Sequence, residues 1–286
     1  MLLNALSRGR ARRAGLTRRY GLVLTLSLAA ASPAAQTPRA PDLAALVTQA
    51  DIVDLTHTFD ETTLVWPTSD PMRLEKVADG VTSGGFYYAS NIVHTTEHGG
   101  THLDAPIHFA AGQTTADRVP LSRLIGAAVV IDVSAQAARD ADYLISVADL
   151  RRWEEANGAI GRGSLVLFRT GWSSRWPDAV AYLGTALKGT AGVSQLHFPG
   201  LHPDAATFLV TERLIGAVGI DTASMDRGRS TTFETHRILA AAGVPGFENL
   251  TNLDQLPARG TLLLALPMKV GGGSGGPLRA IAVIAK

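Results

Sequence analysis

Cysteine is absent from the sequence of 286 residues. Its absence excludes disulfide bridges and thiolate metal sites together, so any metal ion in this protein must be held by histidine, aspartate or glutamate. The N-terminal part also lacks a hydrophobic run of membrane-spanning length: its apolar stretch, residues 21–31, is shorter than the about 20 residues that cross a bilayer. The sequence therefore predicts neither a disulfide scaffold nor a membrane-spanning helix at this stretch.

Acidic residues are missing from residues 1–35, where a basic start is followed by the apolar stretch and then by small residues up to Ala35. That order is typical of a secretory signal peptide. The pair Arg18-Arg19 leaves both the Sec and the twin-arginine (Tat) routes open. We expect cleavage between Pro33 and Thr37 and a periplasmic or secreted protein; the alternative is a basic, disordered tail on a cytoplasmic protein. The arginines of this segment are Arg8, Arg10, Arg12, Arg13, Arg18 and Arg19.

Removal of this segment changes the charge balance. The formal net charge at pH 7 is +1, and the loss of six arginines makes it −5. A mildly acidic chain has no electrostatic footprint for nucleic acid, so we expect neither a nucleic-acid partner nor a membrane anchor after cleavage. Length and composition fit one domain. We assign residues 36–50 to a spacer and a short helix capped by Asp42, and residues 51–286 to the domain.

Strand and helix patterns alternate along residues 51–286, which predicts an α/β fold. Residues 126–133 form a continuous apolar run, as expected for a strand covered on both faces. Ser146 and Asp149 form a capping box that opens a helix. Residues 173–202 are expected to be a long functional or interface loop. The predicted strands are 52–57, 86–93, 126–133, 164–170, 214–220, 261–266 and 278–284, and the predicted helices are 147–156, 203–213 and 235–242.

The run from His98 to His108 gathers the residue types that bind metal ions. It holds three of the eight histidines, with the carboxylate of Asp104 between the second and the third. Imidazole and carboxylate are natural protein ligands of zinc and manganese. Pro106 disfavours a helical Ala105, so the segment should be extended or irregular, unlike the helical His-Glu-x-x-His of metalloproteases. The alternative is a polar loop whose histidines only satisfy backbone groups.

The same run resembles the signature His-x-Gly-Thr-His-x-Asp-x-Pro-x-His of the cyclase-type metal-dependent hydrolases, the family of bacterial kynurenine formamidase and isatin hydrolase. The resemblance extends from Asp54-Leu55-Thr56-His57 to Pro277-Leu278-Arg279. It implies a single domain with a mixed β-sheet core and flanking helices, of the swivelling β/β/α kind, and a homo-oligomer, either dimer or tetramer.

The resemblance also assigns site residues. It implies His108 as the catalytic residue that transfers the proton and Trp66 as a substrate-stacking residue, although Thr68-Ser69 replace the glycine that usually follows Trp-Pro in relatives. It implies two zinc or manganese ions per subunit, because a glutamate at position 248 is typical of formamidases, whereas isatin hydrolases resemble the pattern with glutamine. The implied metal ligands are His98, His102, Asp104, His236 and Glu248.

Other polar residues are assigned outside the metal ligands. His57 is expected to be a structural hydrogen-bonding residue, and His94 is expected to lie outside the metal's ligands. Asp221 and Asp226 follow a predicted strand; they either support the site or cap and close a turn. The glycine run 271–276 has no phosphate-binding motif, since no Lys-Ser/Thr follows it.

Three functions are compatible with these residues. The leading hypothesis is a metal-dependent amidohydrolase like arylformamidase, which cleaves N-formylkynurenine to kynurenine and formate in tryptophan catabolism. The second is a hydrolase of a cyclic amide such as isatin. The third, of another class, is a catalytically silent metal- or ligand-binding protein on the same fold. In the first two, a metal lowers the pKa of bound water from 15.7 toward about 7 and stabilises the oxyanion.

Overall fold

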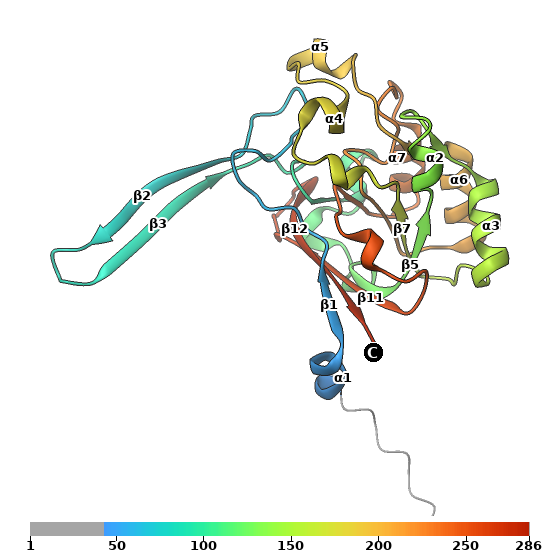
Figure 1. The fold of residues 1–286 in the computed structure, drawn as a ribbon, viewed down its shortest axis with the longest axis horizontal. Helices are drawn as coiled ribbons and strands as arrows, with labels where there is room; N and C mark the ends of the chain where they lie inside the picture. Colours follow the sequence, from blue (N-terminus) through green and yellow to red (C-terminus); the bar gives the residue numbers. More distant parts are fainter. Residues whose placement is uncertain (1–42, 286) are drawn as a thin grey trace, which may run out of the picture. The chain divides into compact units, whose positions relative to one another are not determined.

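The centre of the fold is a mixed β-sheet that curls back on itself (Figure 1). The computed structural model describes residues 43–285, which lie in one compact unit beginning at Asp42. The predicted signal peptide, the spacer and the capping residue Asp42 lie outside the described residues. In spatial order the strands are β1 (Asp51–Asp54), β12 (Gly275–Ile284), β11 (Thr261–Pro267), β5 (Ile125–Asp132), β7 (Leu165–Arg169), β9 (Ala217–Ile220), β10 (Gly246–Glu248) and β4 (His102–Asp104).

The two ends of this strand order meet at β12. Its residues 278–284 pair with β11, and its first residues, 275–277, pair with β4. Strands β5, β7, β9 and β10 run parallel to one another. The other pairs of the sheet, β5–β11, β10–β4 and β12–β1 among them, are antiparallel. The predicted α/β fold with a mixed sheet is therefore confirmed. The closure places β4 between β10 and β12, two strands far from it in sequence.

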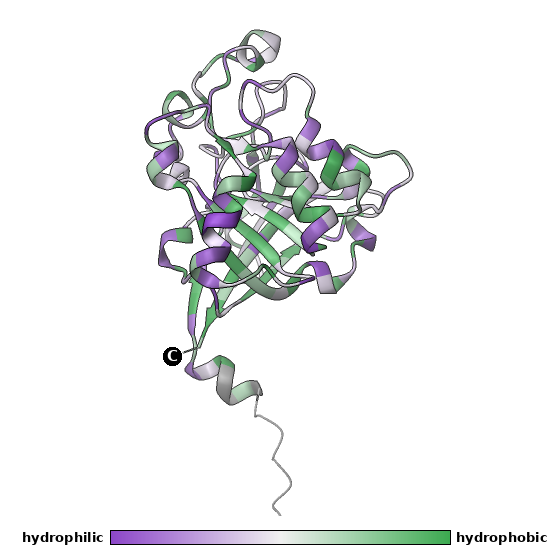
Figure 2. Cartoon of the chain, turned by 90° about the vertical axis from the view of Figure 1, so that its right-hand side faces the viewer, coloured by the Kyte–Doolittle hydropathy of each residue, from purple (hydrophilic) through white to green (hydrophobic). Residues whose placement is uncertain are grey.

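The parallel strands are buried on both faces, as their apolar runs predict. In β5, Ala128 and Val130 pack in one hydrophobic core inside the curled sheet, while Val129 and Ile131 pack in a second core against the helices. Successive side chains point to opposite faces of a strand, so each strand serves both cores. Figure 2 shows the hydrophobic residues concentrated on these central strands.

Helices cover the outer face of the sheet through the second core. Residues of α3, α6 and α7 contribute to that core together with β5, β7 and β9. Among the described residues no helix is long and apolar enough to cross a bilayer. The helices are α1 (Leu43–Gln49), α2 (Ser134–Ala137), α3 (Val147–Asn157), α4 (Ala179–Leu183), α5 (Gly189–Val193), α6 (Pro203–Phe208) and α7 (Glu234–Ala241).

Most predicted elements occur, with changes at their ends. The capping box of Ser146 and Asp149 opens α3 as predicted. The predicted helix 203–213 is α-helical only to Phe208 and continues as a π-helical turn, Leu209–Arg213. The first predicted strand ends at Asp54 rather than at residue 57, because beyond it only Thr56 makes an isolated bridge. Sequence reasoning missed β10 and treated β4 only as an extended segment.

A separate hairpin extends away from the sheet (Figure 1). It consists of β2 (Arg73–Val81) and β3 (Tyr87–His94), paired antiparallel with a bulge between Lys76 and Ala78. Only the second strand was predicted. β2 carries no clear alternation of apolar and polar residues, because neither of its faces is covered by the described residues.

The predicted loop 173–202 is not a single irregular segment. It contains α4, α5 and the short strand β8 (Gly200–Leu201), which pairs with β6 (Leu144–Ile145). Tyr182 and Phe198 of this segment form a third buried cluster with the preceding Trp172. Trp66 packs against that cluster. This segment is therefore one wall beside the site described next.

Candidate metal centre

A cavity with a polar end and an apolar end lies where β4 and β10 meet. Six of its lining residues are the predicted metal and catalytic residues: His98, His102, Asp104, His108, His236 and Glu248. The structure thus brings together residues from a loop, two strands, a 3-10 turn and a helix that are far apart in sequence.

The sheet register places three of these side chains. Glu248 at the end of β10 pairs directly with His102 on β4, and Gly246 pairs with Asp104. His102 and Asp104 are two residues apart on an extended strand, so both point to the same face. Ala105 is extended (φ −77°, ψ 151°) before Pro106, as predicted. Gly100 adopts φ +60° just before the strand, a left-handed conformation that suits glycine.

His102 shows whether this site fits a cation. Its Nδ1 lies 2.9 Å from the carbonyl oxygen of Gly100 and donates to it. Its Nε2 is buried without a hydrogen-bond partner, 3.3 Å from Asp104 Oδ1 and 3.4 Å from Glu248 Oε2. One imidazole nitrogen and two carboxylate oxygens therefore converge on one buried point, and a positive charge is required there. These donors fit a divalent metal ion.

The ionisation of the site leads to the same conclusion. Burial alone would lower the pKa of His102, but the interactions with Asp104 and Glu248 raise it to about 9. Burial would raise the pKa of Asp104, yet hydrogen bonds with His102, His236 and His98 hold it well below its ordinary value. Burial, followed by the charge of Asp104, raises the pKa of Glu248. The carboxylates draw positive charge to the histidine that faces them.

His236 enters the site from α7 and is oriented by Asp226. Its Nε2 lies 2.9 Å from Asp104 Oδ2 and 3.0 Å from Glu248 Oε1, while its Nδ1 lies 2.6 Å from Asp226 Oδ2. Asp226 also accepts the backbone N–H groups of Thr235 and His236. This acid therefore has both of the roles that the sequence left open: it caps the start of α7 and supports the site. Such carboxylate–histidine pairs orient metal ligands.

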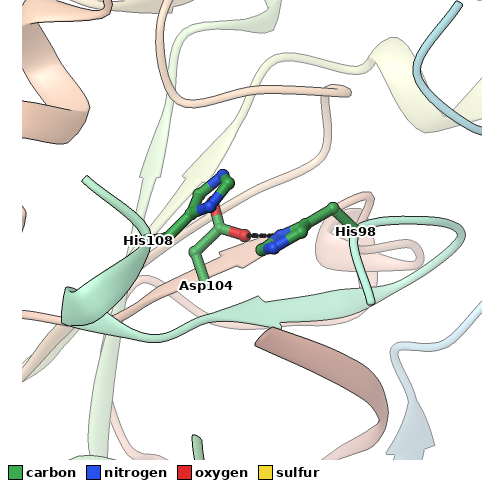
Figure 3. A group of neighbouring side chains, drawn as sticks. All are labelled: His98, Asp104 and His108. Carbon is green, nitrogen blue, oxygen red and sulfur yellow. Dashed lines mark hydrogen bonds and ion pairs between the residues drawn. The ribbon is translucent and has the colours of Figure 1, made fainter. Parts of the chain in front are cut away.

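His98 is held by two residues that sequence reasoning did not assign. Its Nε2 lies 2.9 Å from Ser274 Oγ, and that hydroxyl donates to Glu97 Oε2 at 2.6 Å. The hydroxyl proton is committed to Glu97, so the serine oxygen accepts from Nε2–H. His98 Nδ1 consequently faces Asp104 Oδ1, 2.6 Å away (Figure 3). A Cβ on Gly275 would lie 2.6 Å from the His98 ring, which explains part of the glycine run.

Ser274, His98 and Asp104 have the connectivity of a serine-hydrolase triad, and residues 272–276 match Gly-x-Ser-x-Gly by letter. The structure argues against that mechanism. The glycine run leads directly into β12 instead of forming a strand-to-helix elbow. Ser274 does not line the cavity, and its proton is donated to Glu97 rather than to His98. Ser274 therefore orients His98.

His108 closes the polar end of the cavity. Its ring stacks on His98, with centroids 3.8 Å apart and an interplanar angle of 18° (Figure 3). Burial, more than the neighbouring histidines, lowers its pKa to about 4 and outweighs the opposing effect of Asp104. The sequence alone predicts a histidine with the ordinary pKa of 6.5. The neutral ring is therefore favoured in the folded protein, and a neutral imidazole is able to accept a proton.

The apolar end of the cavity is aromatic. Trp66 lines it despite the altered turn that follows, and its predicted role in stacking on substrate stays a prediction. Phe233 lies 6.1 Å from Trp66 and 5.4 Å from Phe109, measured between ring centroids. Neither phenylalanine was singled out from the sequence. Phe233 has φ +48°, which is rare for a bulky residue and could not be inferred from its neighbours.

Three further polar residues lie outside the cavity lining. His94 is exposed on the hairpin and pairs with Glu75, in agreement with its expected place outside the site. His57 stacks on Trp176 at 4.3 Å, and its Nε2 has no hydrogen-bond partner; its predicted role as a hydrogen-bonding side chain was wrong. Asp221 accepts hydrogen bonds from Thr170 and Gly171 and so closes the turn after β7.

Two neighbouring sets of ligand atoms can hold ions, and both include Asp104. One set is His102, Asp104 and Glu248, and the other is His98, Asp104 and His108. His236 reaches two carboxylates of the first set, as described above. Asp104 is therefore common to both sets.

Several known proteins are similar to this chain. Residues 53–227 match the family model described as putative cyclase. The chain is 36% identical over 212 residues to an isatin hydrolase of Roseibium aggregatum, covering 71% of this chain and 78% of that protein. The chain belongs to the cyclase family. This confirms the resemblance inferred from the run His98–His108.

Two further relatives extend the comparison. A kynurenine formamidase of Salinibacter ruber is 28% identical over 232 residues, covering 80% of this chain and 96% of that protein. The structure of isatin hydrolase A from Labrenzia aggregata bound to benzyl benzoate superposes with a TM-score of 0.76 at 33% identity, covering 85% of this chain and 96% of that one. Both relatives are hydrolases, and the chain is a metal-dependent hydrolase of this family.

Proposed function

We propose that this protein hydrolyses the amide bond of a small, neutral aromatic substrate, with a cyclic amide such as isatin as the best candidate. The observation that carries the choice is the cavity lining. It pairs the metal centre with a wall of Trp66, Phe109 and Phe233, and no lysine or arginine is among the described residues that line it. Isatin is flat, aromatic and uncharged, and such a wall suits its ring.

N-formylkynurenine differs from isatin because it is charged at both groups of its amino-acid end. It carries an ammonium and a carboxylate on its amino-acid end, and burying either charge without a partner is costly. A carboxylate is best bound by a cationic partner, and apart from the metal-site residues the described lining offers only the neutral polar side chains of Ser69, Thr96, Ser224 and Asn249. The greater identity to the isatin hydrolase, 36% against 28% for the formamidase, supports the same order. This order reverses the one suggested by the sequence, which put arylformamidase first.

Arylformamidase remains the second candidate because of Glu248. A glutamate there led the sequence comparison toward formamidases, and in the structure this side chain faces His102 and His236 as part of the metal site. The residue therefore supports the metal centre in either reaction. The presence of Glu248 therefore bears on the number of bound metal ions more directly than on the identity of the substrate.

Every residue proposed to bind metal here offers a histidine nitrogen or a carboxylate oxygen. We propose that His102, Asp104, Glu248 and His236 hold one zinc or manganese ion and that His98 with Asp104 holds a second. When bound, the metal supplies an acidified water and Lewis-acid stabilisation of the carbonyl oxygen. The buried, unpartnered Nε2 of His102 is the feature of this chain that supports the first ion most directly.

The protein's own residues then handle binding and protons. Trp66 and Phe233 hold the aromatic ring against the apolar end of the cavity. His108, neutral at rest, takes the proton that the attacking water gives up. The C–N bond breaks, and the same histidine returns this proton to the leaving nitrogen. Asp226 and Ser274 keep His236 and His98 oriented throughout.

A comparison of two substrates tests this function. Metal-replete protein should open isatin with a kcat/KM at least about tenfold above that for N-formylkynurenine, since one unpaired buried charge costs more than about 1.4 kcal/mol. A chelator should abolish both activities. Faster cleavage of N-formylkynurenine would select the second candidate. A protein that binds metal and turns over neither substrate would contradict enzymatic function and favour a binding protein.

We also propose export, supported by the composition of residues 1–35. N-terminal sequencing of protein from the periplasm or the medium should find a start between Pro33 and Thr37. An intact Met1 on protein that stays in the cytoplasm would contradict this proposal.

A further inference from the structure

The glycine run that leads into β12 carries a single side chain, that of Ser274, and it lies between Glu97 and His98. The residues on both sides of this serine have no room for a side chain. A Cβ on Gly273 would lie 2.5 Å from Glu97 Oε1, and a Cβ on Gly275 would lie 2.6 Å from the His98 ring. The glycines therefore let the serine hydroxyl come close to both partners.

The hydroxyl of Ser274 has one proton to donate, and Glu97 accepts it. Glu97 Oε2 accepts the backbone N–H of this serine at 3.1 Å and its hydroxyl at 2.6 Å. The serine oxygen therefore faces His98 Nε2 as an acceptor, at 2.9 Å. Glu97 Oε2 itself lies 4.0 Å from His98 Nε2, which is too far for a hydrogen bond. Glu97 also lies outside the cavity lining, so it acts on His98 only through the serine.

His98 consequently has the opposite orientation to two other histidines of the metal centre. His102 and His236 hydrogen-bond through Nδ1 to a backbone carbonyl and a carboxylate, and they turn Nε2 toward Glu248. His98 hydrogen-bonds through Nε2 and turns Nδ1 toward Asp104 Oδ1, 2.6 Å away (Figure 3). A half-turn of the His98 ring would place carbon atoms at both positions and lose both hydrogen bonds.

We propose that Glu97 is the positioning residue that makes Nδ1 of His98 the metal-binding atom. Without Glu97, the Ser274 hydroxyl is free to donate to Nε2, and the ring proton then exchanges through solvent to Nδ1. There it would occupy the lone pair that a metal ion needs, in a hydrogen bond to Asp104. The inference rests on the metal centre proposed above and deepens it. The partner of the second ring nitrogen commonly sets the tautomer and the basicity of a metal-binding histidine.

Three backbone hydrogen bonds that do not involve Glu97 hold the glycine run in place. They run from Gly272 to Asp117 Oδ1, at 3.0 Å, and from Ala116 to Gly273 and from Ala105 to Ser274, each at 2.9 Å. Substitution of Glu97 therefore frees the serine hydroxyl while these three bonds remain. The contact of Asp117 with this run is to backbone alone, so Asp117 serves as a control for the integrity of the loop.

Nuclear magnetic resonance of the imidazole nitrogens tests the assignment directly. In zinc-loaded protein with isotope-labelled histidine, His98 should show a protonated Nε2 and a zinc-bound Nδ1, whereas His102 should show the reverse. The signals of His98 are identified by comparison with His98→Gln. A zinc-bound Nε2 in His98, beside a zinc-bound His102, overturns the proposal and leaves the metal centre intact. A protein in which no histidine binds zinc contradicts the metal centre itself.

The affinity for zinc, measured by competition with a chelating dye, tests the role of Glu97. The relevant ion is the one whose binding is weakened in His98→Gln. Glu97→Ala should raise its Kd about 10- to 100-fold, the usual effect of removing a partner that orients a ligand. Glu97→Gln should stay within about threefold of the wild type, because its amide oxygen still accepts the hydroxyl proton. Asp117→Ala should change the Kd less than about twofold. Equal effects of Glu97→Ala and Asp117→Ala, or of Glu97→Ala and Glu97→Gln, overturn the proposal.

A double-mutant cycle shows whether Glu97 acts through Ser274. Ser274→Ala removes the acceptor of His98 Nε2 and should also raise the Kd for zinc. Adding Glu97→Ala to that variant should change the Kd by less than about twofold, because the two residues act in series on one nitrogen. If the double variant shows the product of the two single effects, the residues act independently and the proposal is wrong.

Discussion

His102 and Glu248 face each other across the antiparallel pair of β4 and β10, with Nε2 3.4 Å from Oε2. The register of the two strands alone places these residues opposite each other. Asp104, two residues along β4, adds the second carboxylate on the same face. A cation site is thus built into the closure of the sheet, and the loop and helix ligands are added around it.

The assignment of His108 leads to the first prediction. His108→Ala should keep its metal and its KM, while kcat falls by about 10²–10⁴, the usual contribution of a positioned acid or base. Metal analysis and steady-state kinetics on one preparation measure both. The control is His197→Ala, which removes a histidine paired with Asp142 outside the cavity. Loss of metal from a folded His108→Ala variant would make His108 a ligand.

Asp226 should govern metal affinity through His236. Asp226→Asn should raise the Kd of the metal about 10- to 100-fold, the usual effect of removing the partner of a ligating histidine. Asp221→Asn, a matched change in the same loop, should leave the Kd unchanged, because Asp221 holds Thr170 and Gly171 instead. Competition with a chelating dye measures both. Equal effects of the two substitutions would show that loop integrity alone sets the affinity.

The free energy of unfolding should depend on pH through the carboxyl group of Asp221. Burial raises its pKa from 3.8 to about 6, against the hydrogen bonds from Thr170 and Gly171. Between these values the folded protein keeps a proton that the unfolded chain has lost, so stability falls as pH rises. By about pH 7 the loss is complete, at about 3 kcal/mol relative to pH values well below 3.8.

Comparison with Asp221→Asn isolates the contribution of Asp221 to the pH dependence of stability. Titrating groups that are the same in both proteins contribute equally, so their contributions cancel in the difference. The free energy of unfolding of the wild type minus that of the variant should fall by about 2 kcal/mol between pH 4 and pH 7. Urea unfolding at four pH values measures it. A difference that is flat or rises with pH would show that the carboxylate of Asp221 is not disfavoured by burial.

Trp66 should contribute to substrate binding and not to metal binding. Trp66→Ala should raise KM for isatin about three- to tenfold, as expected for the loss of one aromatic contact of about 0.5–1.5 kcal/mol. Its metal content should be that of the wild type. Trp176→Ala removes an indole that stacks on His57 outside the cavity lining and should leave KM unchanged. An unchanged KM in Trp66→Ala would remove Trp66 from the substrate site.

Sequence reasoning reached the ligands of this site because they cluster. His98, His102, Asp104 and His108 fall in eleven residues, and Pro106 correctly predicts an extended Ala105. The apolar runs of β5 and β7 predict strands buried on both faces, since no solvent-facing side leaves a polar alternation. These features depend on residues close together in the sequence, and such local patterns can be recognised from a single sequence.

The features that were missed depend on contacts between distant segments. Ser274 meets His98 only because β12 closes the sheet beside β4. Phe233 reaches the cavity through a left-handed backbone conformation that its neighbours do not signal. The hairpin of β2 and β3 has apolar residues on both faces, so no period of two marks its first strand. His57 was misassigned because its stacking partner, Trp176, lies in a segment without regular pattern.

Metal titration into chelator-treated protein tests the central claim most directly. Zinc or manganese added to the wild type should bind stoichiometrically and restore isatin hydrolysis in proportion to the bound ion. His102→Ala should neither bind the ion at the first site nor recover activity, since it removes the nitrogen that faces Asp104 and Glu248. His94→Gln, altered on the exposed β2–β3 hairpin, should bind the ion like the wild type. Wild-type turnover of isatin that persists without metal, or full metal binding by a folded His102→Ala variant, would contradict the account.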